Sequence, residues 1–420
     1  MKPGSLLFLS AIFFNLSVLA HTHHKEPLLV KPGIWRGVFT TAGGDIPFNF
    51  KISGTDQSKL TLTLLNAARQ DDFAVQRKGE DSLLVPMNTF DAVLLIKIGA
   101  GGLLQGVYQN KVPGNTSKPL SFTAEYGKSY RFATAAGGSP ARADLNGKWL
   151  IKIHGKEPVP DKVALFTQKG PALSGVIMQV TGDSGDLEGT VAGNTFQLST
   201  FIGSSPRLYK GTILADGTIA GIWSVSNGDT VRYTGRKDEN AALPDAYKLT
   251  YLKPGYDKLD FTFPGLDGQP VSLHDKQFKG KVVILDILGS WCPNCMDETQ
   301  FLAPWYKENK ARGIEIAGIS FERKDSLAYA QYTLTKLKAK YGIEYPLLFG
   351  GYADTKVVAE KFPALNAFLA FPTTILIDRQ GRVREIYTGF SGKATGKYYE
   401  EFKTTFNALI DKLVAEPTAP

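Results

Sequence analysis

Cysteine is scarce in this chain, and the scarcity restricts what the thiols can do. Only two cysteines occur among 420 residues, Cys292 and Cys295, on either side of Pro293-Asn294. A disulfide framework is therefore excluded. Any intramolecular disulfide closes a loop too short to restrain the unfolded chain. A structural zinc site needs about four ligands. The chain has no second CxxC, and nothing places His274, the nearest histidine, beside the pair, so zinc is disfavoured.

Long apolar runs are also scarce. The one candidate, Leu6 to Leu19, is short for a membrane span, which needs about 20 residues, and Asn15 interrupts it. A basic start and an Ala20 cleavage position are typical of a signal peptide. We therefore predict a signal peptide over residues 1–20 and an exported, soluble, periplasmic mature chain without a transmembrane span. Retention as an uncleaved anchor is the alternative. The net charge of +8 comes from scattered residues, and no nucleic-acid-binding motif is evident.

Helical periodicity is scarce from residue 28 to about residue 240. Short apolar runs alternate there with Gly, Asn and Asp turns, a pattern typical of antiparallel strands. The pattern also repeats along the chain. Gly33-Ile34-Trp35 resembles Gly147-Lys148-Trp149, and Gly102–Tyr108 resembles Gly217–Trp223 at nearly the same spacing. A duplicated β-rich half is therefore indicated.

We predict two tandem antiparallel β units, residues 28–135 and 143–237, followed by a linker over residues 238–256. Each unit is expected to be a small barrel or sandwich, because closure removes exposed strand edges. The tryptophan of each Gly-x-Trp is expected to pack inside its unit. No catalytic constellation is evident in this half. His154 is expected to be a surface or hydrogen-bonded residue and not a ligand, and most of three tyrosines are expected in the core. These tyrosines are Tyr108, Tyr130 and Tyr209.

The segment around the cysteine pair has the order strand, CxxC, helix. Residues 281–288 predict a buried parallel strand, and residues 296–312 predict a helix. Cys292 is thus expected to be exposed at a helix N-terminus, where free N–H groups favour a thiolate. CxxC beside a βαβ pattern is mainly a redox signature, and a structural disulfide is the alternative. A peroxidase frame is disfavoured, because Gly289 stands where that frame needs Thr or Ser.

The other sequence patterns between residues 257 and 416 predict strands and helices in the order of an α/β domain. Residues 261–273 predict a hairpin, and residues 314–321 predict a strand. A helix is expected from Asp325 to Tyr341, with Asp325 as its N-cap and Gly342 beyond its end. The later elements are two strands and a final helix, over residues 371–378, 382–387 and up to about 414.

With these elements the chain resembles the thioredoxin superfamily, and within it the TlpA/ResA-like exported thiol–disulfide oxidoreductases. The resemblance covers residues 257–416, and the β-rich half lies outside it. The predicted fold class is therefore multidomain: two tandem antiparallel β units followed by an α/β thioredoxin-like domain. The motifs that carry the resemblance are Asp260-Phe261-Thr262-Phe263, Gly280-Lys281-Val282-Val283, Trp291-Cys292-Pro293-Asn294-Cys295 and Pro372-Thr373-Thr374-Ile375-Leu376-Ile377-Asp378.

The resemblance implies roles for individual residues. Cys292 would be the attacking thiolate and Cys295 the resolving thiol. Pro372 would be a cis-proline that faces the pair. Trp291 and the backbone of Phe371 would belong to the substrate-binding face.

Two acids flank the pair in the sequence. Asp286 stands where thioredoxins carry a buried acid that accepts the proton of the resolving thiol, and Glu298 matches an acidic position of ResA-like members. Either acid could instead be structural, Asp286 as a buried polar group and Glu298 as a first-turn helix acid. The chain departs from the family at Ile287-Leu288-Gly289, where Phe-Trp-Ala is usual, so the shape of the substrate stays open.

The predicted function is dithiol–disulfide exchange with protein thiols or disulfides, without a cofactor or a metal. A helix N-terminus favours the thiolate and nearby carboxylates disfavour it, so reductase, oxidase and isomerase all stay open. The resemblance makes a reductase with an upstream electron donor the first choice. The alternative is a partner-binding, glycan-binding or assembly protein whose β-rich half is the main functional part.

Overall fold

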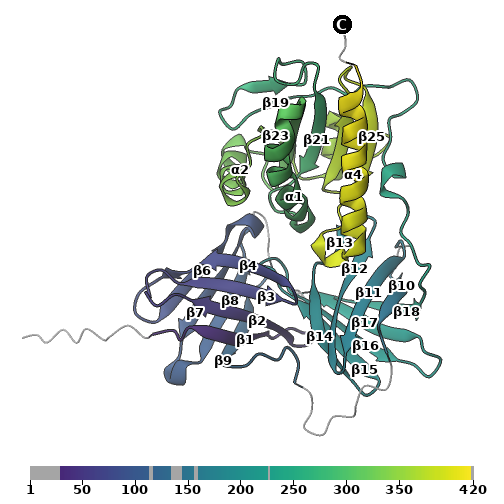
Figure 1. The fold of residues 1–420 in the computed structure, drawn as a ribbon. Helices are drawn as coiled ribbons and strands as arrows, with labels where there is room; N and C mark the ends of the chain where they lie inside the picture. The colour runs from purple at the N-terminus through teal and green to yellow at the C-terminus, as the bar shows by residue number, and fades with distance from the viewer. Residues whose placement is uncertain (1–28, 113–116, 134–143, 156–158, 226–227, 418–420) are drawn as a thin grey trace, which may run out of the picture.

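The computed structural model describes residues 29–112, 117–133, 144–155, 159–225 and 228–417. The expected signal peptide over residues 1–20 lies outside these ranges. Figure 1 shows two β-rich bodies side by side, with an α/β body above them that carries the C-terminus. None of the helices in the described ranges is long and apolar enough to cross a membrane.

The first β-rich body, here called the first barrel, is one antiparallel sheet in the spatial order β4-β3-β2-β1-β9-β8-β7-β6-β5. Its first strand lies between its second and its last strand. The strands are β1 Gly33–Phe39, β2 Ile46–Ser53, β3 Thr61–Asn66, β4 Arg69–Ala74, β5 Gln76–Arg77, β6 Ser82–Met87, β7 Ala92–Ile98, β8 Leu104–Asn110 and β9 Leu120–Tyr126, with 3₁₀ turns η1 Asn88–Phe90 and η2 Ala100–Gly102.

The second barrel repeats this order, because its first strand, β10, also lies between its second and its last strand. An added pairing of β11 with β12 closes the sheet into a ring. The strands are β10 Gly147–His154, β11 Lys162–Lys169, β12 Ala172–Gln179, β13 Gly182–Asp183, β14 Leu187–Ala192, β15 Thr195–Thr200, β16 Arg207–Ile213, β17 Ile219–Val225 and β18 Thr230–Lys237. The expectation of two barrel-like antiparallel units is confirmed.

The Gly-x-Trp motif has the same local structure in both barrels. The indole N–H of Trp35 donates to the carbonyl of Lys31 at 3.1 Å, and that of Trp149 donates to the carbonyl of Leu145 at 2.9 Å. Both tryptophans are buried, as expected. Gly33 and Gly147 open the motifs at φ of +133° and +105°, a region that side chains with a Cβ rarely adopt. The motif therefore forms the same buried tryptophan contact in each barrel.

Most of the three tyrosines lie in the core, as expected. Tyr108 and Tyr209 are buried in the two barrels, whereas Tyr130 is exposed and stacks on the guanidinium of Arg36. His154 is exposed at the end of β10 and bonds Thr234.

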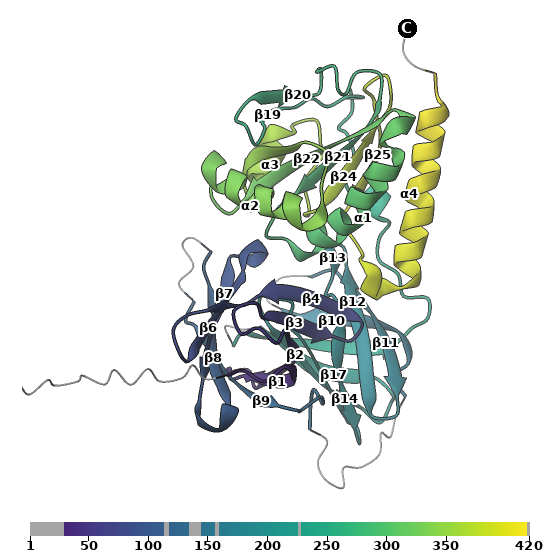
Figure 2. The same ribbon diagram turned by 60° about the vertical axis from the view of Figure 1, so that its left-hand side comes forward.

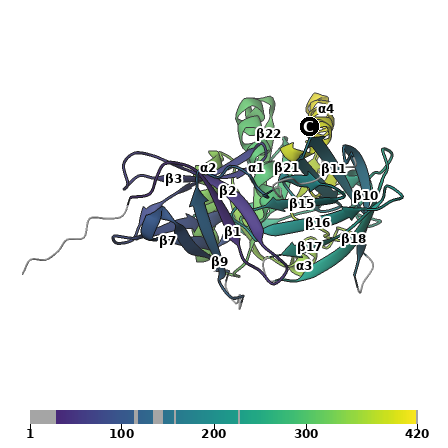
Figure 3. The ribbon, with the colours of Figure 1, turned by 90° about the horizontal axis from the view of Figure 1, so that it is seen from below.

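Polar contacts join the two barrels, which lie side by side in Figure 3. Ser199 Oγ donates to the carbonyl of Pro47 at 2.6 Å, and Asn66 Nδ2 donates to the carbonyl of Phe201 at 2.8 Å. The guanidinium of Arg131, buried between the barrels, bonds Glu188 at 2.9 Å. The two units are thus packed against each other through buried hydrogen bonds and an ion pair.

The C-terminal domain, from β19 to α4, is built on a mixed sheet in the order β23-β22-β21-β24-β25. β21, β22 and β23 are parallel, and β24 and β25 run antiparallel to their neighbours. The elements are β19 Thr262–Pro264, β20 Pro270–Ser272, β21 Val282–Leu288, α1 Pro293–Asn309, β22 Ile314–Glu322, α2 Leu327–Tyr341, β23 Leu347–Tyr352, α3 Thr355–Lys361, β24 Thr373–Ile377, β25 Val383–Thr388 and α4 Lys397–Ala415, with 3₁₀ turns η3 Ala246–Lys248, η4 Lys310–Arg312 and η5 Lys393–Thr395.

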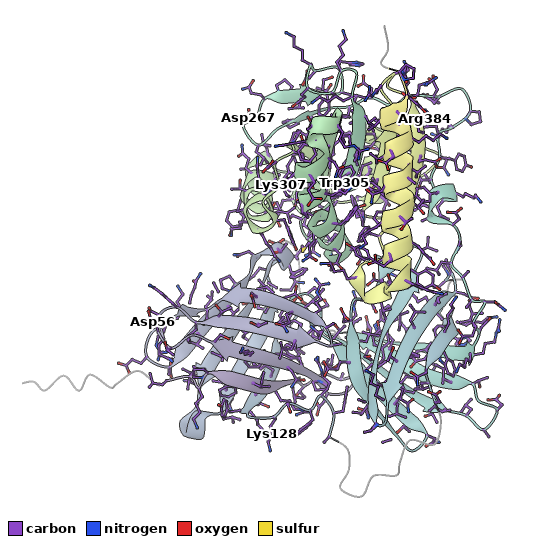
Figure 4. The ribbon with its side chains drawn as sticks, in the orientation of Figure 1. Asp56, Lys128, Asp267, Trp305, Lys307 and Arg384 are labelled. Atoms are coloured by element: carbon purple, nitrogen blue, oxygen red, sulfur yellow. The ribbon has the colours of Figure 1, made fainter. Side chains whose placement is uncertain are left out.

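Helices cover both faces of this sheet. The core on one face gathers buried residues of α1, α2 and α4, and the core on the other gathers α3 and the β19–β20 hairpin. Figure 2 shows α1 and α4 along the same side of the sheet. Trp305 of α1 donates to Asn407 of α4 at 2.8 Å, and Arg384 of β25 binds Glu416 just beyond α4 (Figure 4).

Two expectations about helix starts are corrected. The helix after the cysteine pair begins at Pro293 and not at Met296, because proline fits the first helical position and Cys292 serves as N-cap. The N-cap of α2 is Ser326 and not Asp325. Its hydroxyl accepts the N–H of Tyr329 at 3.4 Å, which is the reach that an N-cap side chain needs.

The unit boundaries stay a prediction that isolation of the β-rich half would test. We expect residues 29–240 alone to give a far-UV circular dichroism spectrum of β type and a cooperative melt. Trp149→Ala should lower the stability of that segment by about 3–5 kcal/mol, because it empties a buried aromatic site. A helical or unfolded spectrum would contradict the two-unit organisation.

Candidate active site

The cysteine pair lies where a fully buried strand meets a helix. β21 ends at Leu288, and Cys292 caps α1 with φ near −92°. Its sulfur accepts the N–H of Cys295 at 3.3 Å. That contact places Cys292 Sγ on the free amide groups of the first helical turn.

Phe371 and Pro372 face the pair from the start of β24. The Phe371–Pro372 peptide bond is cis, as the resemblance implied. The thiol of Cys292 lies 3.5 Å from the carbonyl of Phe371. The ring of Trp291 meets that of Phe371 edge to face at 5.5 Å, and its indole N–H donates to Phe321 at 2.9 Å. The three residues expected at the substrate face therefore surround Cys292.

The two expected acids come together behind the pair. Asp286 on β21 stands opposite Thr374 on β24, and the Thr374 hydroxyl donates to Glu298 Oε1 at 2.5 Å. Burial raises the pKa of Asp286 to about 7. Burial first, and then the charge of Asp286, raises the pKa of Glu298 well above its usual range. The side chains of Asp286 and Glu298 also interact with each other. With its pKa near 7, Asp286 is placed to exchange a proton near neutral pH.

Cys295 is the less accessible thiol. It is 1 % exposed, and burial raises its pKa well above the usual range, with the proximity of Cys292 and the charge of Asp286 acting in the same direction. A thiol in that setting needs a base before it can attack a disulfide.

Glu322 supports the turn before the pair and was missed from the sequence. It is buried at the end of β22 and accepts the N–H and the hydroxyl of Ser290 at 3.1 Å and 2.7 Å. Ser320 donates to the same carboxylate. An acid at the end of a β-strand carries no sequence signal of such a role, because Ser290, which it supports, belongs to another loop.

Cys292 was expected to be exposed, but it is buried, with only 5 % of its surface accessible. The second barrel covers it. Asn294, between the two cysteines, lies so close to Gly182 that a Cβ there would fall 1.5 Å from Asn294 Nδ2. Asp183, next to Gly182, accepts the N–H of Gly392 at 2.7 Å. These contacts hold the Gly182 turn against the start of α1.

The first barrel reaches the same helix. Arg69 of β4 binds both carboxylate oxygens of Asp297 at 3.0 Å and 3.1 Å and also binds Asp71. Burial raises the pKa of Asp297 to about 6, although Arg69 opposes the shift. On α2, the hydroxyl of Tyr329 donates to Asp91 of the first barrel. Both barrels therefore contact the C-terminal domain beside the cysteines.

A pocket of about 170 Å³ remains between these three parts of the chain. Its floor is formed by Cys292, Asn294 and Phe371, and its walls come mostly from the second barrel, with Arg69 from the first. Within the described ranges no group of three or more His, Cys, Asp or Glu residues could hold a metal ion. The arrangement is suited to thiol chemistry in a confined space.

Proteins of known family resemble the C-terminal part of this chain, which holds the cysteine pair. The model of the AhpC/TSA family matches residues 254–386. That segment is a thioredoxin-like domain of the AhpC/TSA family.

Two relatives of the thioredoxin-like domain are named thiol-disulfide oxidoreductase ResA. The protein of Bacillus subtilis (strain 168) is 28% identical over 140 residues, which are 33% of this chain and 69% of the relative. The protein of Geobacillus thermodenitrificans (strain NG80-2) is 28% identical over 144 residues, 34% of this chain and 73% of the relative. The similarity supports a thiol–disulfide oxidoreductase for this third of the chain.

Solved structures match the same part. A secreted thiol-disulfide isomerase from Corynebacterium glutamicum is 24% identical, covering 41% of this chain and 96% of that chain at a TM-score of 0.30. A thiol:disulfide interchange protein of the thioredoxin family from Chlorobium tepidum is 21% identical, covering 38% and 96% at a TM-score of 0.29.

Substitution of Gly182 tests the cover over Cys292. Gly182→Ala should speed the alkylation of Cys292 by iodoacetamide several-fold, because the new Cβ displaces the barrel from Asn294. Gly185→Ala is the matched control, since Gly185 is also at positive φ but its Cβ would meet open space. Mass mapping after brief labelling measures both. Equal rates in the two variants would contradict the covering role.

Proposed function

We propose that this protein is an exported thiol–disulfide oxidoreductase that acts as a reductase through Cys292 and Cys295. One observation carries the proposal: Cys292 Sγ, at the start of α1, lies 3.3 Å from the N–H of Cys295 and 3.5 Å from the carbonyl of Phe371 before Pro372. Thiol exchange needs an attacking sulfur at a helix N-terminus, a second thiol one turn inside and a backbone edge for the substrate, and this geometry supports each of these needs. The pocket over Cys292 is the route by which a substrate would reach the attacking sulfur.

The exchange would proceed in two steps. The Cys292 thiolate attacks one sulfur of the substrate disulfide, forms a mixed disulfide and releases the first substrate thiolate. Asp286 then takes the proton of Cys295, whose thiolate attacks Cys292 Sγ. A disulfide forms between the two cysteines, and the second substrate thiolate leaves. Two electrons pass to the substrate, and an upstream dithiol donor would return them.

The reducing direction rests on the resemblance to ResA-like thiol–disulfide oxidoreductases. Burial, the neighbouring Cys292 and the charge of Asp286 raise the pKa of Cys295, so this thiol keeps its proton until it resolves the mixed disulfide. Export is supported by the apolar pattern of residues 1–20, and protein thiols or disulfides are the substrates that the family implies.

Trapping tests the roles of the two cysteines. Cys295→Ser should accumulate a mixed disulfide between Cys292 and a disulfide substrate such as insulin, because the resolving thiol is gone. Cys292→Ser should trap nothing. Non-reducing electrophoresis followed by mass mapping distinguishes the variants. A stable adduct on Cys295 in the Cys292→Ser variant would reverse the assignment.

The proton acceptor is tested by the pH dependence of the second step. Asp286 accepts a proton only when ionised, so release of the mixed disulfide should speed up as pH rises through about 7 and then level off. Asp286→Asn should slow release more than formation and should move the rise to higher pH, where Cys295 ionises by itself. Stopped-flow measurement of both steps decides this. Equal slowing of the two steps would count against the role.

A further inference from the structure

The closed second barrel has a hollow interior. Its cavity, of about 80 Å³, is larger than the 10–15 Å³ or so that one water needs. The walls are mainly apolar and aromatic, from strands on several sides of the barrel. They include Ile151, Phe166, Phe196, Leu198, Tyr209 and Tyr233. Small closed barrels are wide enough to hold one small ligand, and this lining suits a ring or a short aliphatic group.

Two cationic side chains interrupt the apolar lining, and no acid is among the lining residues. They are Lys162 of β11 and Arg207 of β16. No salt bridge joins either cation to an acid within the described part of the chain. Lys162 is buried, donates to Gln179 and lies 5.3 Å from the centre of the Trp223 ring. Burial and the charge of Arg207 lower the pKa of Lys162 to about 8.

An unpaired donor lies in the same lining. The indole N–H of Trp223 is buried and has no acceptor among the described residues. A buried donor without an acceptor is costly. Among the described residues, two cations without an acidic partner and one N–H without an acceptor are therefore groups that a carboxylate or another anion would satisfy.

The barrel cavity borders the pocket over the cysteine pair. Gln179, Ser184 and Arg207 line both the barrel cavity and the pocket over Cys292. The guanidinium of Arg207 therefore lies between the apolar interior and the pocket that holds the attacking sulfur. A molecule with its apolar group in the barrel and its anionic group at this junction would extend toward Cys292.

We propose that the second barrel binds small disulfides that carry a carboxylate and an apolar group, and presents them to Cys292. This substrate class would stand beside protein disulfides, and the inference rests on the proposed thiol exchange. The apolar group enters the barrel, and the carboxylate binds Arg207 and Lys162. Cys292 then attacks the nearer sulfur and releases one small thiolate. Cys295 attacks Cys292 Sγ and releases the other, so the dithiol loses the two electrons that the small disulfide gains.

Two aromatic disulfides, one negatively charged and one neutral, test the proposal in the full chain. Dithiobis(nitrobenzoate) carries carboxylates, dithiodipyridine is neutral at pH 8, and both release coloured thiols. Arg207→Met should lower the rate with the carboxylate probe by about tenfold, the scale of a lost charge-assisted contact, and should leave the neutral probe nearly unchanged. Lys162→Met should act in the same direction. Lys152→Met, which removes an exposed charge from β10, is the matched control.

A competition experiment on the unaltered protein does not depend on the folding of variants. Nitrobenzoate, which has the carboxylate and the ring but no sulfur, should slow the reaction with dithiobis(nitrobenzoate). Nitrobenzamide, its neutral counterpart, should not. Equal effects of the two competitors, or equal losses with both disulfides in Arg207→Met, would overturn the anion site. Failure of the proposed thiol exchange looks different: Cys292→Ser would then react with both probes as fast as the unaltered chain.

Discussion

Asn294, between the two cysteines, lies against the Gly182 turn of the second barrel, and this contact brings the barrel over Cys292. The turn approaches so closely that only a glycine fits there. Asp183 and Arg69 strengthen the same contact from two sides, through Gly392 and Asp297. Thiol chemistry that a lone thioredoxin-like domain would present on its surface is therefore carried out at the bottom of a pocket.

The β-rich half and the redox pair thus form one site. The pocket over Cys292 takes its floor from the C-terminal domain and most of its walls from the second barrel. The sequence left open a choice between a redox enzyme and a binding protein, and we propose that the two halves act together. The closed barrel supplies an apolar cavity with two cations, Lys162 and Arg207, and the thioredoxin-like domain supplies the cysteine pair. In this proposal the barrels control access and the thioredoxin-like domain carries out the chemistry.

What the sequence could predict was local. The strand, CxxC and helix order follows from the apolar run before Cys292 and the helical pattern after it, and the two barrels follow from turn-punctuated strands and a repeated Gly-x-Trp. Even so, a single hydroxyl decided one detail: Ser326 and not Asp325 caps α2. The burial of Cys292 could not be predicted, because it depends on residues that lie far from it in the chain. In the sequence, Gly182 is typical of a turn glycine and Arg69 of a charged residue on a β-strand. Their contact with α1 becomes apparent only in the folded chain.

The most direct test of the covering role compares the full chain with its thioredoxin-like domain. Residues 257–416 alone, checked for folding by circular dichroism, and the full chain would be assayed for reduction of insulin disulfides from the same dithiol donor. If the barrels restrict access to Cys292, the isolated domain reduces insulin several-fold faster than the full chain. Equal rates would show that the barrels do not control what reaches the thiol.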